Sequence, residues 1–268
     1  MTALALTMVG TGIAPVRANP VVESIPVEVA ETLEAALLRQ AAALDPRVLA
    51  LALQSHDSAL NRGLLTDRNT LTVIDYSRPS VEPRFWVFDL GMRRVLFEEL
   101  VAHGKNSGEN FATEFSNVES SLQTSLGLFV TRDVYYGKHG ESLRLEGLEP
   151  GVNDRALERA IVIHGAQYVS SYAVASLGFL GRSWGCPALS REAAPRVIDR
   201  IRGGSAVFAF YPDKEWLASS RFLRLTPEEM LDAPNAGSTT APYVATSVPE
   251  PGPAAPVTFF PLRIALMS

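Results

Sequence analysis

The sequence predicts a mainly β fold with helices (α+β), a β-sandwich or an irregular barrel preceded by an N-terminal helical segment. Apolar residues recur every three or four positions as far as residue 62, which is the period of a helix. From residue 70 the period changes to two, in short runs rich in β-branched and aromatic residues. Gly, Asn, Asp and Pro separate these runs. The 268 residues suit one domain of fair size with appendages, or at most two small domains.

Residues 1–18 are predicted to be a signal peptide for export. Residues 3–14 are apolar and small, and Val16-Arg17-Ala18 offers small residues at the two positions that a signal peptidase reads. The positive charge that usually precedes the apolar run is missing, so an ordinary flexible terminus is the alternative. The run is too short to span a bilayer as a helix, and no transmembrane span is expected.

Residues 28–62 are predicted to form two helices that pack against the following domain. Asp45-Pro46 restarts the leucine and valine pattern, with Pro46 where a first helical turn tolerates proline. Gly63 is a natural stop. His56 falls on the polar side of the second helix and is expected at the surface, without a role.

Seven short strands and one helix are expected between residues 70 and 212. The strands are expected at residues 71–74, 84–90, 94–101, 126–131, 142–145, 160–164 and 205–211, and the helix near residues 191–201. The second and third strands read as a hairpin that turns at Gly91-Met92. The long loop from Gly104 to Leu126 is either one wall of a substrate groove or a plain surface excursion.

The strongest chemical signal is one histidine and one cysteine, each at a distinctive position in the predicted strand pattern. A buried strand delivers His164 to Gly165, and the only cysteine of the chain, Cys186, follows in a turn rich in Gly, Ser and Pro. An unassisted cysteine is only about a few per cent thiolate near neutral pH, so an imidazole that takes its proton would activate it. The turn at Gly185-Cys186 would leave backbone N–H groups free to face an oxyanion.

Two further arguments concern Cys186. An exported protein with one cysteine forms no internal disulfide, and an unpaired thiol in an oxidising compartment is a liability unless it is used. Cys186 is also expected just ahead of the helix near residues 191–201, whose N-terminal partial charge would favour the thiolate.

At these residues the chain resembles the L,D-transpeptidases of bacterial cell walls, and more closely their branch in which the histidine reads His-Gly-Ala and the cysteine lies in Ser-x-Gly-Cys-Pro. The similarity covers roughly residues 70–212, the expected catalytic domain. It takes in residues 72–77, 101–108, 135–140 and 203–205, in the family's order.

The resemblance implies a nucleophile at Cys186, a base at His164 and a backbone carbonyl at Gly165 that orients the imidazole. The substrate implied is a peptidoglycan stem peptide. With the predicted signal peptide, the expected location is exported and periplasmic, and we expect neither a cofactor nor a metal. Most of the wider family has a second histidine directly before Gly-Cys and an arginine shortly after it. This chain has Trp184 and Pro187-Ala188 there, so the family's contacts are not transferred to those positions.

Five residues around the pair are candidates for substrate binding: His139, Arg182, Ser183, Trp184 and Gly185. Ser183 would donate to the substrate or brace the turn, and Arg182 would pair with a substrate carboxylate or point to solvent. His139, in a short polar and aromatic loop, would line the site or stabilise a turn. His103 reads better as a residue that stabilises its own turn.

Three hypotheses remain open. The first is cysteine acyl transfer, ending on an amine (transpeptidase) or on water (L,D-carboxypeptidase). The second is a zinc hydrolase with ligands at His103, His139, His164 and Cys186, although these spacings lack the close ligand pairs of usual zinc motifs. The third is a non-catalytic wall-binding module.

Composition excludes some classes and leaves other questions open. A net charge of -5 without a basic stripe argues against nucleic acid. No phosphate-binding Gly-rich loop or dinucleotide fingerprint is present. Residues 233–268 form a tail rich in Pro and Ala that is expected to be disordered in part. The oligomeric state does not follow from the sequence.

Overall fold

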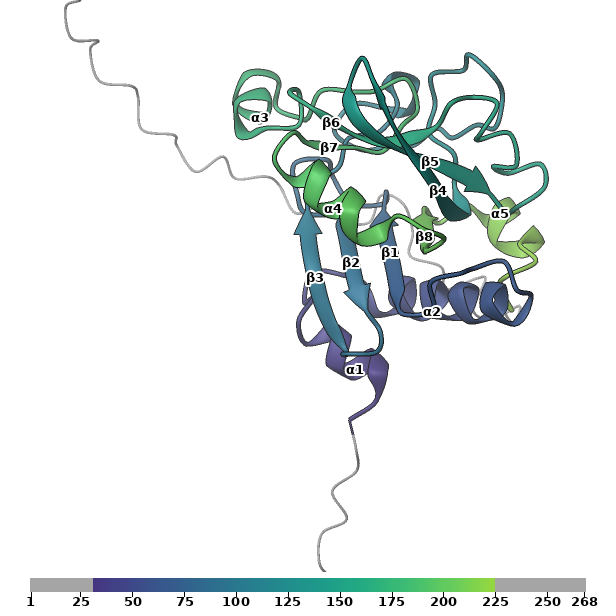
Figure 1. Cartoon of the computed structure of the whole chain (residues 1–268). Coiled ribbons are helices and arrows are strands. Elements are labelled where there is room, and N and C mark those ends of the chain that lie inside the picture. Colours follow the sequence, from purple (N-terminus) through teal and green to yellow (C-terminus); the bar gives the residue numbers. More distant parts are fainter. Residues whose placement is uncertain (1–30, 225–268) are drawn as a thin grey trace, which may run out of the picture.

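The structure, a computed structural model, describes residues 31–224 of the chain (Figure 1). The predicted signal peptide and the predicted disordered tail lie outside the described residues. Within residues 31–224, helices and eight strands alternate in an α+β fold dominated by one sheet. The helices are α1 (Leu33–Leu38), α2 (Pro46–Asn61), α3 (Ser171–Leu177), α4 (Ala193–Ile201), α5 (Lys214–Ser219) and the 3-10 helix η1 (Lys105–Ser107).

The two helices at the start of the described range have local causes. The Thr32 side chain caps α1 by accepting a hydrogen bond from the Ala35 N–H. Asp45 caps α2 by accepting from the Arg47 N–H, and Pro46 occupies the first turn, where its missing N–H costs nothing. The prediction for His56 is wrong: this side chain is buried, because it lies on the face of α2 that packs on the sheet.

Seven of the eight strands match the sequence prediction in position. The strands are β1 (Thr70–Asp75), β2 (Phe85–Asp89), β3 (Arg94–Glu99), β4 (Gly127–Gly137), β5 (Gly140–Gly147), β6 (Val162–Ala166), β7 (Ala188–Ser190) and β8 (Ala206–Phe210). β2 and β3 form the expected antiparallel hairpin. β7 was not predicted because it is too short for a periodic pattern, and α3 and α5 were not predicted either.

The eight strands of the described range form a nearly closed sheet in the order β3-β2-β1-β8-β4-β5-β6-β7. The pairs β1–β8 and β6–β7 are parallel, and the other neighbours are antiparallel. Ala102, shortly after β3, exchanges two backbone hydrogen bonds with Ala188 of β7, of 2.8 and 3.3 Å. Because β3 and β7 are the two ends of the strand order, this bridge joins them. The mainly β fold is therefore confirmed, in the form of an irregular barrel.

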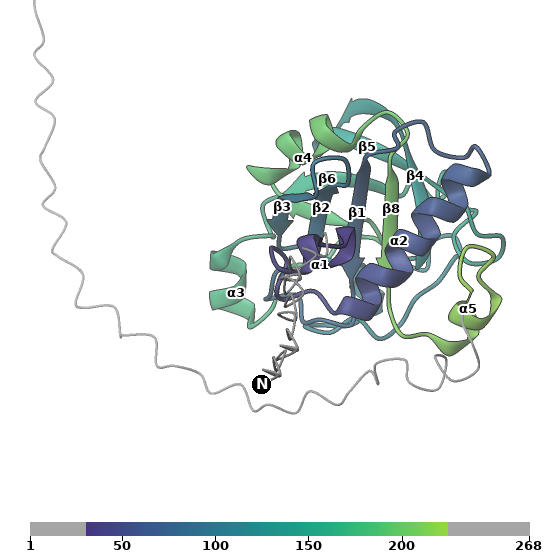
Figure 2. The same cartoon turned by 90° about the horizontal axis from the view of Figure 1, so that it is seen from below.

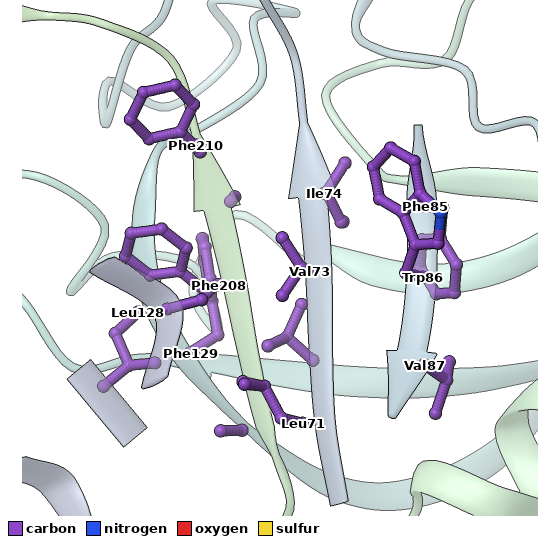
Figure 3. Close-up of a cluster of buried hydrophobic side chains, with 14 of the residues drawn as sticks. Leu71, Val73, Ile74, Phe85, Trp86, Val87, Leu128, Phe129, Phe208 and Phe210 are labelled. Atoms are coloured by element: carbon purple, nitrogen blue, oxygen red, sulfur yellow. The ribbon is translucent and has the colours of Figure 1, made fainter. Parts of the chain in front are cut away.

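The core lies around the central strands β1, β2 and β8, which are buried at every position. Figure 3 shows their side chains, with those of β4, filling the space beside the strands. α2 packs against β1 and β8, and Figure 2 shows it crossing these strands. α4 packs against β5, β6 and β7. Because both of their faces are covered, the central strands are buried throughout and lack the expected alternation of buried and exposed residues.

Candidate active site

The turn that carries Cys186 is fastened to the barrel through its backbone. The Ser183 N–H donates to the His103 carbonyl at 2.9 Å, and the Lys105 N–H donates to the Ser183 carbonyl at 2.7 Å. On the other side, the Thr124 hydroxyl donates to the Gly185 carbonyl at 3.2 Å. These bonds come from the start and the end of the long loop between residues 104 and 126, so that loop supports the turn.

Ser183 braces the cysteine turn from inside. Its hydroxyl donates to the Cys186 carbonyl at 2.6 Å and accepts from the Gly185 N–H at 3.0 Å. The expectation that the Gly185 N–H is free to face an oxyanion is therefore wrong. A side-chain acceptor two residues back takes up this donor, as serine often does in tight turns.

Gly185 has no room for a side chain. Its φ is +120°, and a Cβ atom would lie 2.7 Å from the Gln123 carbonyl oxygen. Gly104 packs against its back, since a Cβ on Gly104 would lie 3.0 Å from the Gly185 Cα. The turn can approach the loop this closely only because both positions are glycine.

His164 lies in β6 with one ring nitrogen engaged by its own backbone. Nδ1 is 3.1 Å from the Gly165 carbonyl oxygen. A carbonyl oxygen only accepts, so Nδ1 carries the proton in this contact and Nε2 of the neutral ring is an acceptor. This tautomer is the one that a base acting through Nε2 needs.

The parallel pairing of β6 with β7 brings the cysteine alongside this histidine. His164 is paired with Ala188, two residues after Cys186. The Val162 backbone, two residues before His164 on the same strand, donates a hydrogen bond to the Cys186 sulfur. Both groups also feel one cation, because the Lys138 ammonium lowers the pKa of His164 and that of Cys186. The register therefore places the turn that carries Cys186 next to the strand that carries His164.

Cys186 does not lie directly ahead of a helix, as the sequence predicted. Pro187 and β7 follow it, and α4 begins only at Ala193. The expected support from a helix N-terminus is thus replaced by other contacts. Burial, the largest cause, raises the pKa of the Cys186 thiol, whereas the Val162 N–H and the charges of Arg159 and Lys138 lower it. The thiol is protonated at rest and needs a base.

His164 meets that need. Burial, the largest cause, lowers its pKa below the ordinary 6.5, and the charges of His139 and Lys138 lower it further, against the opposing effect of the Gly165 carbonyl. The imidazole is therefore neutral near pH 7 and can accept a proton.

His139 and Lys138 form the tip of a hairpin that leans over the site. The sequence suggested a short loop at residues 135–140, but β4 and β5 run on to pair Gly137 with Gly140, leaving a two-residue turn. The His139 ring lies 4.5 Å from the His164 ring, centroid to centroid, at an interplanar angle of 31°. The Lys138 ammonium lies 4.7 Å from the Trp184 ring centroid. The tip thus contacts both the histidine strand and the cysteine turn.

Two other candidates occupy different surroundings. Trp184 is 70% exposed, so it packs beneath nothing and presents its ring beside the site. Arg182 donates to the Gly108 carbonyl at 3.0 Å and lies over the Phe179 ring, which ties it to the long loop.

His103 belongs to a buried network behind the cysteine turn. The Arg84 guanidinium, fully buried, donates to His103 Nδ1 at 2.7 Å and to the carbonyls of Val101 and Arg78. Burial and the charge of Arg84 lower the pKa of His103 to about 3. Sequence analysis missed Arg84, and a lone arginine at the start of an apolar run was the available signal.

The four side chains considered for zinc do not form a metal site. In the described part of the chain, no three His, Cys, Asp or Glu side chains cluster in a way that could hold a metal ion. His103 already accepts from Arg84, which takes its Nδ1 out of any ligand set.

Fold and site together define a mainly β protein with a histidine on β6 and a cysteine in the turn before the parallel strand β7. A sequence model of one family, described as the L,D-transpeptidase catalytic domain, matches residues 40–210. The chain belongs to the L,D-transpeptidase catalytic domain family. No curated protein matches the sequence.

Solved structures of low sequence identity were also found. An L,D-transpeptidase from Mycobacterium smegmatis is 17% identical, with 53% of this chain and 59% of that chain covered and a TM-score of 0.34. L,D-transpeptidase 1 of Mycobacterium tuberculosis is 16% identical, with 53% and 61% covered and a TM-score of 0.31. The helical cell shape determining protein Pgp2 of Campylobacter jejuni is 15% identical, with 53% and 47% covered and a TM-score of 0.35. This chain thus spans about half to three fifths of those structures.

Helices able to cross a membrane were sought in residues 31–224 and none was found.

Proposed function

We propose that this protein is an L,D-transpeptidase that transfers acyl groups between peptidoglycan stem peptides through a thioester on Cys186, with His164 as general base and acid. The observation that supports the proposal is the β6–β7 pairing, because it sets the strand of His164, whose Nε2 can accept a proton, next to the turn that holds the single cysteine of the chain. A buried, protonated thiol next to a neutral base is the arrangement that nucleophilic catalysis by cysteine requires.

The first half-reaction uses both groups. His164 Nε2 takes the proton from the Cys186 sulfur, which attacks the amide carbonyl that follows the L,D-configured diamino acid centre of the stem. Nε2 then returns that proton to the nitrogen of the departing D-alanine, and the C–N bond breaks. The acyl group remains on sulfur as a thioester. We propose that the Cys186 N–H faces the oxyanion, because Ser183 engages the Gly185 N–H.

The second half-reaction resolves the thioester. An amine of another stem attacks the thioester carbon and His164 takes its proton. The C–S bond then breaks, and His164 returns the proton to the departing sulfur, which regenerates the thiol and the neutral imidazole. Water in place of the amine gives a hydrolysed stem, which is the L,D-carboxypeptidase outcome of the same site.

The substrate contacts follow from exposure and partners. We propose that His139, beside the His164 ring, and the exposed ring of Trp184 contact the stem peptide. Ser183, Arg182 and Gly185 would act on the substrate through the shape of the turn that they hold. The proposed location is exported and periplasmic, where peptidoglycan is found.

The test is mass analysis of products from a defined mixture of tetrapeptide muropeptides. The intact protein should form cross-linked or shortened stems, stoichiometric iodoacetamide should abolish this, and EDTA should leave it unchanged. Cys186→Ala should lose all turnover, with folding checked by circular dichroism. Turnover that survives in Cys186→Ala would disprove the nucleophile assignment. Wall binding without turnover by the intact protein would show a binding module instead.

A further inference from the structure

Arg159, which is far from Cys186 in the sequence, lies against the turn that carries Cys186. Arg159 belongs to the irregular segment that leads into β6. A Cβ atom on Gly185 would lie 3.5 Å from Arg159 Nη2. The guanidinium is therefore packed on the residue that immediately precedes the proposed nucleophile.

The guanidinium is held in place by neutral acceptors. Arg159 donates to the carbonyls of Ser116 and Gln123, each at 2.6 Å, and to the hydroxyls of Ser121, at 3.2 Å, and Ser125. All four acceptors come from the second half of the long loop. Arg159 has no carboxylate partner among residues 31–224, so its positive charge is not neutralised locally.

The surroundings of the sulfur show what this charge does. Besides Arg159, the ionisable groups that interact with Cys186 are Lys138 at the hairpin tip and the hydroxyls of Tyr76 and Tyr168, with His164 on the neighbouring strand. The two tyrosines are neutral near pH 7, because burial raises the pKa of both. Arg159 and Lys138 are therefore the cations that can stabilise a thiolate here, and of the two only Arg159 is fixed by hydrogen bonds.

We propose that Arg159 is a positioning residue for the reaction: its fixed positive charge favours the thiolate of Cys186 at the moment when His164 takes the proton. The inference rests on the proposed function of Cys186 as the nucleophile. It also gives a physical reason why the chain can carry Pro187-Ala188 after the cysteine, since a cation reaches the turn from a distant part of the sequence.

The experiment measures the rate of Cys186 alkylation by iodoacetamide from pH 6 to 10.5, followed by intact mass. Arg159→Gln should move the rate profile to higher pH and slow alkylation about fivefold at pH 7, because removal of a nearby cation disfavours the thiolate. Arg159→Lys keeps the charge with fewer hydrogen bonds, and its profile should stay within about twofold of the original. Ser121→Ala removes one contact of the guanidinium without its charge and should leave the profile unchanged.

A purely structural role predicts a different pattern. Arg159→Lys and Arg159→Gln would then lose thermal stability together, and neither profile would shift along the pH axis, which would overturn the proposal. If Arg159→Gln does not fold, an Arg159→Lys profile that moves to higher pH overturns it as well, and an unmoved one supports it. Since alkylation reports thiol ionisation without turnover, a failure of the proposed function would appear separately, as muropeptide turnover by the alkylated protein.

Discussion

Two His-Gly pairs, His103-Gly104 and His164-Gly165, lie on either side of β7, the strand that follows Cys186. The surroundings of the two histidine rings give them opposite tautomers. Ala188 of β7 is paired with Ala102, next to His103, on one side and with His164 on the other. Both rings are almost fully buried, with 1% of His103 and 2% of His164 exposed. Residue type, following glycine and burial are thus the same, and only the partners of the rings differ.

The partner of Nδ1 decides the tautomer. Nδ1 of His103 accepts from the Arg84 guanidinium, which can only donate, so Nε2 carries the proton of the neutral ring. Nδ1 of His164 faces a carbonyl oxygen and carries the proton itself, so Nε2 is free to accept. The pKa of His103, about 3, keeps that ring neutral and out of proton transfer. His103 therefore supports the cysteine turn, and His164 is the histidine that can accept a proton.

Replacing His164 should have the largest effect. His164→Gln keeps a polar group near the Gly165 carbonyl but removes the base, so kcat should fall by about 10²- to 10⁴-fold. Steady-state muropeptide turnover measures the loss, and the melting temperature should change little. If turnover stayed within tenfold, the assignment of the base to this side of the turn would be wrong.

Replacing His103 tests the other side of the comparison. His103→Leu removes the acceptor of the buried Arg84 guanidinium, and an unsatisfied buried donor costs about 1–3 kcal/mol. The melting temperature should fall by about 3–10 °C, as differential scanning calorimetry can measure. Well below that temperature, the pH dependence of kcat should keep its acid limb. An acid limb that moved would show that His103 takes part in proton transfer.

The next prediction concerns Lys138, the positive charge at the hairpin tip, and its effect on the pKa of His164. Activity should fall with decreasing pH through the pKa of His164, which lies below the ordinary 6.5. The Lys138 cation disfavours the imidazolium, so Lys138→Met should raise the pKa of His164 and move the acid limb to higher pH, with about a two- to fivefold loss at pH 6. A full pH profile of kcat checks this. Lys105→Met serves as the control, because Lys105 is not among the charges that shift the pKa of His164 or that of Cys186.

The smallest effect is expected from replacing His139, whose ring lies at the tip of the hairpin. His139→Ala uncovers the His164 ring and removes a proposed wall of the groove, so KM should rise about two- to fivefold with a smaller change in kcat. Tyr136→Ala, on the same hairpin and 80% exposed, is the matched control and should leave KM unchanged. Equal effects of both substitutions would assign the change to the hairpin as a whole.

Much of the fold followed from patterns read along the chain. The helical period before residue 62, the capping pair Asp45-Pro46 and seven strand runs all have local causes, and the structure contains the corresponding elements. β7 has three residues, and its existence depends on pairing with β6 and with Ala102. No local pattern predicts a strand that only long-range partners create.

The sequence by itself was enough to propose the reacting pair, because a buried strand ending in His164 and a single cysteine in a glycine-rich turn are chemical signals that can be recognised without knowledge of contacts. Only the tertiary structure decided how that pair is tuned. The burial of His56 and His103, the engaged Gly185 N–H, the hairpin tip over His164 and the Arg159 charge beside Cys186 join segments far apart in the chain. Burial and Coulomb interactions depend on distance in space, which residue spacing along the sequence does not encode.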